Sequence, residues 1–131
     1  MSAPTWTVIV HCGAGWHNPE KREIYQESMI QACYEAGKLL TRNARGDFSV
    51  SLSATAEVLK ILEDDTTTNA GTGSALNIKG NVEMDCGIMD GNCGGFGAVG
   101  AISNVLNPSS VALHILSNSV SLLPLGRIPP M

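Results

Sequence analysis

The stretch from residue 69 to residue 91, NAGTGSALNIKGNVEMDCGIMDG, constrains the fold more than any other part of the chain. Gly71 and Gly73 allow a positive φ or a close approach to a neighbouring group. Residues 74–78 and 82–89 are expected to be extended, and the Lys-Gly-Asn turn between them predicts a β-hairpin. The Asp-Gly pair at the end of the stretch predicts another turn.

The rest of the chain alternates extended and helical patterns. Apolar and β-branched runs predict strands, and apolar residues at helical spacing predict helices. The sequence predicts a strand over Thr5–Val10, a helix from Asn18 to about Asn43, a loop at Arg45-Gly46-Asp47, a helix from Ser51 or Ser53 to Leu62, a strand over Phe96–Ser103, and a helix from Asn107 to about Ser117. With the hairpin, the predicted order is β-α-α-β-β-β-α.

The helix boundaries and buried faces follow from local signals. Asn18-Pro19 and Asn107-Pro108 each combine an N-cap residue with proline at the first helical position. Residues at helical spacing are expected to face the core. They are Tyr25, Met29, Ala32, Cys33, Ala36 and Leu40 in the first helix, Ala54, Val58, Ile61 and Leu62 in the second, and Val111, Ala112, Ile115 and Leu116 in the third.

Composition limits the classes of function. A net charge of -4 argues against a nucleic-acid surface, which needs basic residues to meet phosphates. No apolar run approaches the roughly 20 residues that cross a bilayer. The N-terminus also lacks the basic and apolar regions of a signal peptide, so we expect a cytoplasmic or nuclear protein.

Several groups of reactive side chains have competing interpretations. Cys12, Cys33, Cys86 and Cys93 lack the paired spacing of a structural zinc site and are expected to be free thiols. The run Glu63-Asp64-Asp65 is interpreted as solvated carboxylates rather than a divalent-metal site.

The glycine loop Gly13-Ala14-Gly15 is not a dinucleotide fingerprint, because Asn18 stands where the third glycine is required. His11 and His17 flank this loop, and a chemical role for either remains the less favoured alternative. His114 lies off the apolar stripe of its helix and is expected to be exposed.

Five motifs in order give the chain a family resemblance. They are HCGAGWH (11–17), NAGTGSALN (69–77), GNVEMDCGIMDG (80–91), FGAVGAIS (96–103) and NPSSVA (107–112). Together they resemble the plant-type asparaginase and threonine aspartase (taspase) family of N-terminal-nucleophile hydrolases. The Trp16-His17 pair and the closing GRIPP (126–130) are most similar to the taspase form.

The resemblance implies a fold and a function. The fold expected is α/β (α+β), with residues 1–131 forming a single N-terminal segment of an incomplete αββα N-terminal-nucleophile hydrolase sandwich and leaving an apolar face uncovered. The activity expected is that of a threonine-type endopeptidase cleaving protein substrates after Asp. The alternatives are an isoaspartyl peptidase/L-asparaginase, or a non-enzymatic truncated partner of an intact homologue.

The resemblance also implies site residues and partners. Gly13, Ala14, Gly15 and Asn69 are expected to line the active site. A structural sodium ion, the one cofactor expected, would be held by main-chain carbonyls of Leu62, Glu63, Asp65, Thr68, Ala70 and Thr72. The expected partners are an Asp-containing protein substrate and a homologous subunit, with no nucleic acid and no membrane.

The catalytic threonine of this family lies in a downstream motif that the sequence lacks. It acts as nucleophile with its own α-amine as base. The Asp65-Thr66 and Gly71-Thr72 bonds are poor maturation sites, because no apolar strand follows either threonine directly. We therefore expect these residues alone to be inactive.

Overall fold

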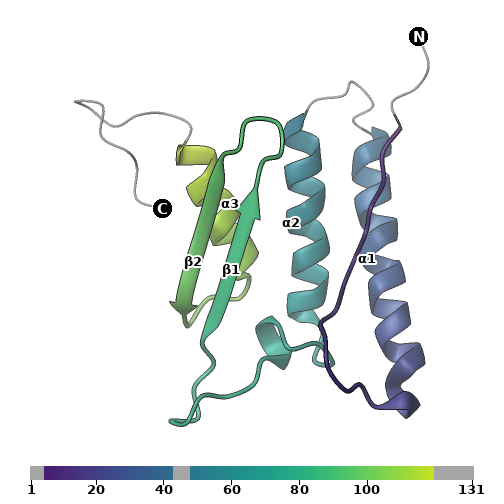
Figure 1. Ribbon diagram of the computed structural model, residues 1–131, viewed down its shortest axis with the longest axis vertical. Coiled ribbons are helices and arrows are strands. Elements are labelled where there is room, and N and C mark those ends of the chain that lie inside the picture. Colours follow the sequence, from purple (N-terminus) through teal and green to yellow (C-terminus); the bar gives the residue numbers. More distant parts are fainter. Residues whose placement is uncertain (1–4, 43–47, 120–131) are drawn as a thin grey trace.

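The computed structural model describes residues 5–42 and 48–119, in which three α-helices and a two-stranded sheet are present (Figure 1). The helices are α1 (Arg22–Arg42), α2 (Phe48–Asp64) and α3 (Pro108–Ser119), and the strands are β1 (Met84–Met89) and β2 (Phe96–Ile102). The short 3-10 turns are η1 (Pro19–Lys21) and η2 (Gly71–Gly73). Helices α1 and α2 stand side by side, and α3 packs against the sheet. This mixed architecture confirms the expected α/β class.

Helix α1 starts where the sequence predicts. The Asn18 side chain accepts a hydrogen bond of 3.0 Å from the backbone N–H of Glu20, and Pro19 opens η1 directly before α1. A proline there loses nothing, because the first helical N–H groups have no intrahelical partner. Helix α2 begins at Phe48, earlier than predicted. The predicted loop 45–47 and the motif 126–130 lie outside the described residues.

The core consists of two apolar clusters that share α2. In the first, Ala32 and Ala36 of α1 meet Ala54, Val58 and Leu62 of α2. The alanines leave space for the two helix backbones to approach closely. The predicted buried faces of both helices are therefore confirmed in their central positions.

The second cluster joins the other side of α2 to the sheet. It contains Ala56 of α2, Ile88 of β1, and Ala112 and Leu116 of α3. A Cβ at Gly97 would lie 2.3 Å from the carbonyl oxygen of Ala112, so the backbone of β2 rests directly on α3. This contact explains why the predicted strand is rich in small residues.

The sheet carries a β-bulge near the start of β1. Pairing runs antiparallel from Met89↔Phe96 to Met84↔Ile102, and the register shifts between Met84 and Cys86. At the shift, the Asp85 carboxylate accepts a hydrogen bond of 2.7 Å from the backbone N–H of Ala101, whose φ is +50°. Bulges re-aim side chains, and this one places Asp85 on a cavity wall.

The hairpin predicted from residues 74–89 is wrong in its first arm. Within the described chain, only an isolated bridge, Leu76↔Val82, forms around the predicted turn, and β1 pairs with β2 instead. Hydrogen bonds from Ser74 N–H to the Gly71 carbonyl and from Ala75 N–H to Asn69 hold the arm in the preceding loop. Too few residues then remain to form a strand.

The Thr5–Val10 segment is extended, as its composition predicts, but it pairs with no strand among the described residues. Val8 and Val10 pack against the first cluster, whereas Ile9 is 86% exposed. This alternation is typical of a strand with one buried face. The prediction of a strand is therefore wrong in hydrogen bonding, and the packed face of the segment is limited to the half-buried Val8 and Val10.

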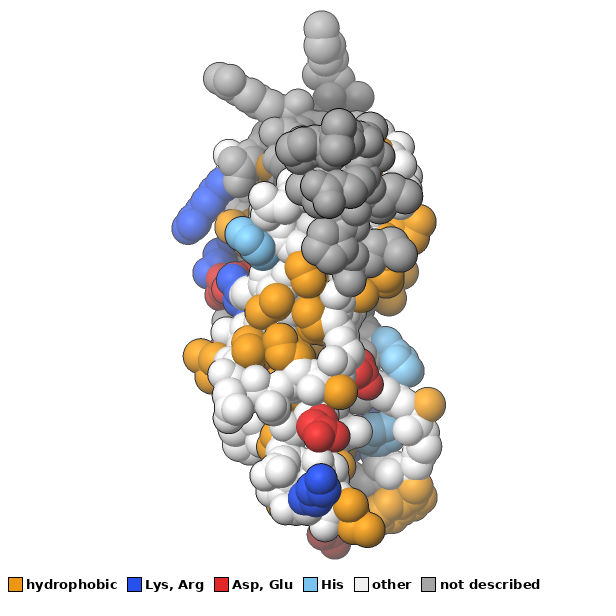
Figure 2. Space-filling model, turned by 90° about the vertical axis from the view of Figure 1, so that its left-hand side faces the viewer, with side chains coloured by type: hydrophobic (Ala, Val, Ile, Leu, Met, Phe, Trp, Pro, Cys, Tyr) orange, Lys and Arg blue, Asp and Glu red, His pale blue; other side chains and the backbone are white. Residues whose placement is uncertain are grey.

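Apolar surface remains uncovered on the sheet, as expected for an incomplete sandwich. Met89 is 62% exposed and Phe96 is 44% exposed. Hydrophobic side chains also gather on the side of the molecule that Figure 2 faces. Within the described residues, no helix is both long enough and apolar enough to cross a membrane.

Candidate functional site

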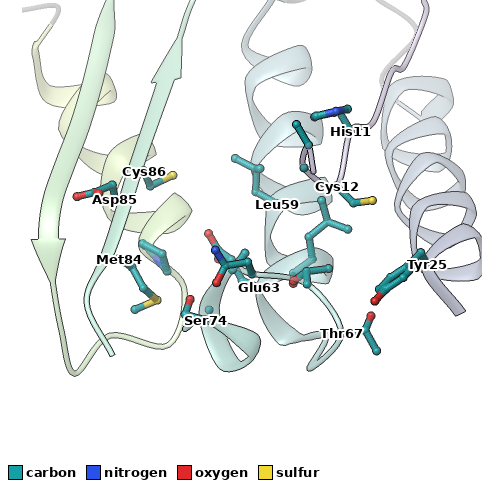
Figure 3. A pocket seen from close by; sticks show the side chains of 18 of the residues that line it. His11, Cys12, Tyr25, Leu59, Glu63, Thr67, Ser74, Met84, Asp85 and Cys86 are labelled. Carbon is teal, nitrogen blue, oxygen red and sulfur yellow. The ribbon is translucent and has the colours of Figure 1, made fainter. Parts of the chain in front are cut away.

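A cavity of about 660 Å³ opens where the N-terminal segment, the C-terminal end of α2 and the start of β1 converge (Figure 3). Its walls come from segments far apart in the sequence. His11 and Cys12 lie on one side, Asp85 and Cys86 lie on the other, and Glu63 lies between them. Of the predicted lining residues, the cavity brings together Gly13, Ala14 and Asn69, and Gly15 is absent from its wall.

The glycine loop owes its shape to backbone conformation. Gly13 and Gly15 have φ values of +116° and +115°, and a Cβ at either would have no atom within 4 Å. Glycine is required there for its conformational range and not for lack of space. His17 supports the loop, because its Nε2 lies 3.4 Å from the Gly13 carbonyl oxygen and its ring meets Tyr25 edge-on at 5.4 Å.

The loop that carries Asn69 folds back onto the end of α2. Asn69 Oδ1 accepts a hydrogen bond of 2.8 Å from the backbone N–H of Ala75, and Ala70 O accepts one of 3.1 Å from Gly73 N–H. Gly71 has φ +52°, and a Cβ there would lie 2.1 Å from the Glu63 carbonyl oxygen. The loop therefore packs main chain against main chain, which fixes Asn69 at the cavity wall.

Main-chain oxygens converge in this loop in a way that fits a hard cation. A Cβ at Gly73 would lie 2.1, 2.9 and 3.0 Å from the carbonyl oxygens of Thr68, Thr66 and Asp65. Oxygen ligands of this type suit hard cations. Asp65 and Thr68 belong to the predicted sodium set, and Thr66 does not. The Leu62 carbonyl, also predicted, accepts a hydrogen bond of 2.5 Å from the Thr68 hydroxyl.

The remaining carbonyls of the predicted set lie on the same turn. The Glu63 carbonyl oxygen lies close to Gly71, and Ala70 directly precedes η2. Thr72 lies within η2 and is exposed. Among the described side chains, no group of three or more His, Cys, Asp or Glu residues gathers to hold a metal. Any cation at this turn would therefore depend on main-chain oxygens.

Asp65 is tied into the loop rather than simply solvated. Burial alone would raise the pKa of Asp65, but hydrogen bonds from Ser28 and Thr67 outweigh it and lower the pKa below the ordinary value of 3.8. The Thr67 backbone N–H and hydroxyl each donate to Asp65 Oδ1 at 2.7 Å. Because a carboxylate of lowered pKa is a weak base, this contact does not activate the Thr67 hydroxyl.

Glu63 contradicts the prediction of a solvated carboxylate most clearly. It is 4% exposed, and its two oxygens accept hydrogen bonds of 3.0 Å and 2.9 Å from the backbone N–H and the hydroxyl of Ser109. Ser109 lies in the first turn of α3, whose N–H groups have no intrahelical partner and carry partial positive charge. The prediction failed because the partner lies 46 residues away in sequence.

The cysteines are free thiols, as predicted. Burial, together with the charge of Glu63, raises the pKa of the Cys86 thiol. A raised pKa keeps the thiol protonated, and the thiolate is the nucleophilic form. Cys86 is therefore a weak nucleophile although it faces the cavity.

None of the threonines weighed as cleavage sites begins a strand. Thr66 lies in the turn after α2, and Thr72 lies in η2. His11 is exposed on the cavity wall, and His114 is exposed on α3 beside Asn118. Within the described residues, the cavity thus offers a shaped wall with no activated nucleophile.

Comparison with known proteins shows which proteins this chain is similar to. A family model described as Asparaginase matches residues 4–124. The plant-type L-asparaginase of Pyrococcus abyssi is 39% identical over 121 residues, covering 92% of this chain and 38% of that relative. An isoaspartyl peptidase/L-asparaginase of Xenopus laevis is 35% identical over 116 residues, covering 88% of this chain and 36% of the relative. The chain therefore spans little more than a third of the length of these curated relatives.

Proposed function

Because this chain belongs to the plant-type asparaginase and isoaspartyl peptidase family of hydrolases, we propose that it forms one wall of a site that hydrolyses asparagine or isoaspartyl amide bonds. The observation that carries the proposal is the cavity joining Gly13, Ala14 and Asn69. Asn69 is held through its Oδ1, and the glycine loop presents main chain with no side chain larger than the methyl group of Ala14. Both features suit a small polar substrate that the wall orients.

The chemistry divides between this wall and the rest of a family-length chain. Hydrolysis needs a nucleophile and a base, and the resemblance assigns both to an N-terminal threonine outside these residues. Glu63 and Asp85 are the carboxylates on the cavity wall, and no Lys or Arg of the described chain lies there. A substrate carboxylate would therefore find its cationic partner on the portion of a family-length chain that these residues do not cover.

The aspartyl endopeptidase interpretation is supported less well than its alternative. The relatives matched are named for asparaginase and isoaspartyl peptidase activity. The described feature that favours the endopeptidase is Trp16, which is 83% exposed beside the glycine loop and could contact an extended peptide. The two interpretations differ in substrate and can be separated by one assay.

The assay uses the chain co-expressed with the C-terminal portion of the Pyrococcus abyssi relative. We expect no turnover from the chain alone, and ammonia release from asparagine or hydrolysis of an isoaspartyl dipeptide by the complex. Asn69→Ala should lower turnover, and Asn77→Ala is the matched control, because Asn77 also holds a loop but lies outside the cavity wall. Cleavage of an Asp-containing peptide alone would favour the endopeptidase, and a complex without any hydrolysis would refute the proposal.

A structural sodium ion is proposed at the Asp65–Thr68 turn. The convergence of main-chain oxygens near Gly73 supports it. Sodium chloride should raise the melting temperature more than choline chloride at equal ionic strength, because a bound ligand stabilises the folded state. Equal melting temperatures in the two salts would remove this proposal.

The non-enzymatic alternative, pairing with an intact homologue, is favoured by the Thr5–Val10 segment, which pairs with no strand of the described chain, and by the exposed apolar face near Phe96. An exposed strand edge can accept another strand. Gel filtration of the chain mixed with an intact homologue tests this pairing, together with an assay of the homologue's activity. Co-elution with loss of that activity would support the pairing, and no association at micromolar concentration would exclude it.

A further inference from the structure

Two apolar clusters that share α2 lie next to the cavity. The first joins α1 and the Thr5–Val10 segment to α2, and the second joins the sheet and α3 to α2. His11 and Cys12 lie on one side of the cavity, and Asp85 and Cys86 lie on the other (Figure 3). The width of the cavity depends on the contacts that join the two sides.

We propose that Glu63 is the positioning residue that holds the two walls of the cavity in register. Its carboxylate reaches across to α3 and accepts both hydrogen bonds from Ser109, which is fully buried. Its own backbone packs closely against Gly71 in the loop that carries Asn69, where a Cβ would lie 2.1 Å from the Glu63 carbonyl oxygen. One residue thus connects the Asn69 loop to the helix that underlies β1 and β2.

In this bridge between Glu63 and Ser109, the carboxylate is the acceptor of both hydrogen bonds and Ser109 is the donor. A buried carboxylate is costly unless it is hydrogen-bonded, and Ser109 supplies two donors, one of them from the positive end of a helix. An amide in its place could still accept from the Ser109 N–H through its oxygen and donate its NH₂ group to the Ser109 hydroxyl oxygen, but it would lose the charge. Hydrogen bonds to a charged acceptor are the stronger ones, so glutamine would keep the geometry of the bridge and weaken it.

The Glu63 carboxylate also affects the Cys86 thiol on the opposite wall of the cavity. The charge of Glu63 adds to burial in raising the pKa of the Cys86 thiol, so the cavity retains a protonated thiol. Asp85 lies next to Cys86 and is bonded to Ala101, and His11 lies across the cavity. A site built around an external threonine benefits when its own thiol is unreactive. This benefit, and the view that the cavity binds substrate, rest on the proposed function, whereas the bridge itself does not.

The test needs only the chain itself and two substitutions. Glu63→Gln removes the charge, and Ser109→Ala removes the hydroxyl donor while leaving the charge in place. The matched controls are Glu57→Gln, on the same helix with a 42% exposed side chain paired to Lys60, and exposed Ser110→Ala.

Two readouts report on the two walls. Hydrogen exchange at Ala75, bonded to Asn69, reports the first wall, and exchange at Ala101, bonded to Asp85, reports the second. The rate of Cys86 alkylation as a function of pH reports the charge of Glu63, with exposed Cys93 as reference in the same sample.

For Glu63→Gln we expect faster exchange at both amides and faster Cys86 alkylation at neutral pH, because the charge that adds to burial in raising the pKa of the thiol is removed. For Ser109→Ala we expect faster exchange with a Cys86 pH profile close to that of the wild type. If Glu63→Gln does not fold, Ser109→Ala still decides the matter. Exchange and alkylation no different from the controls would overturn the proposal, and this result would leave the hydrolase assay unaffected.

Discussion

Three glycines in or near the Asn69 loop allow conformational and steric requirements to be measured separately. Gly80 has φ +78°, and a Cβ added there would meet nothing within 4 Å, so Gly80→Ala tests conformation alone. Gly73 has no positive φ, but a methyl group there would lie 2.1 Å from the Thr68 carbonyl oxygen, so Gly73→Ala tests sterics alone. Gly71 combines φ +52° with a distance of 2.1 Å to the Glu63 carbonyl oxygen.

The magnitudes follow from these geometries. A left-handed conformation costs an L-residue about 1–2 kcal/mol. Replacing glycine by alanine also lowers the conformational entropy of the unfolded chain, which stabilises the folded state by about 0.4–1 kcal/mol. Gly80→Ala should therefore cost about 1 kcal/mol. The obstacles at Gly73 and Gly71 are main-chain atoms that cannot rotate away, so each clash should reach the upper end of the overpacking range, about 3 kcal/mol. Gly71→Ala should lose about 4 kcal/mol, a large share of the roughly 5–15 kcal/mol that stabilises a domain.

Urea denaturation followed by circular dichroism measures all three losses, and equal slopes would show that the unfolded states are comparable. The expected order of stability loss is Gly71→Ala, then Gly73→Ala, then Gly80→Ala. Hydrogen exchange at Ala75 should rise in the first two variants and stay unchanged in the third, because only the first two displace the Asn69 loop. A Gly73→Ala variant as stable as Gly80→Ala would refute the steric argument.

Three further predictions concern charge, core and capping. Because the pKa of Asp65 in the folded state lies below 3.8, its carboxylate stabilises the fold above that pH and loses this effect as the pH falls further, so Asp65→Asn should flatten the acid limb of a stability–pH curve below about pH 4. Leu116→Ala should cost about 2–5 kcal/mol in urea denaturation because Leu116 is 2% exposed, whereas Leu106→Ala, at 72% exposed, should cost less than about 0.5 kcal/mol. Asn18→Ala should cost about 1 kcal/mol by thermal melting, since it removes the hydrogen bond to Glu20; a loss equal to that of Leu116→Ala would contradict a simple capping role.

Local signals predicted the helices and missed what holds the site together. Asn18-Pro19 and Asn107-Pro108 marked two helix starts, and the spacing of Ala54, Val58 and Leu62 marked a buried face. These features act within a few residues, so the sequence contains all that is needed to read them. The contact between Glu63 and Ser109 spans 46 positions, and nothing in the run of three acidic residues shows which of them is buried.

The strand predictions show the same limit in another form. The pattern of Thr5–Val10 predicted an extended segment correctly, but its side chains are at most half-buried, and hydrogen bonding depends on a neighbour that no local pattern specifies. The arm at residues 74–78 failed because Asn69 and Gly71 take up the backbone groups of Ala75 and Ser74. Gly13, Ala14 and Asn69 line the same cavity, although Asn69 lies too far from the other two in sequence for any spacing argument; they are grouped only through the family resemblance.

The Thr5–Val10 segment has a consequence for handling the protein. Its sequence, TWTVIV, contains no charge, no proline and no glycine, and its residues favour extended structure. Such segments stack readily into cross-β assemblies when their backbone groups are accessible. Ile9 is 86% exposed, so the described part of the chain leaves the middle of the segment largely unshielded. In concentrated solution the chain should therefore convert slowly into fibrillar aggregates. Its storage life should be longer when a binding partner covers the Thr5–Val10 segment.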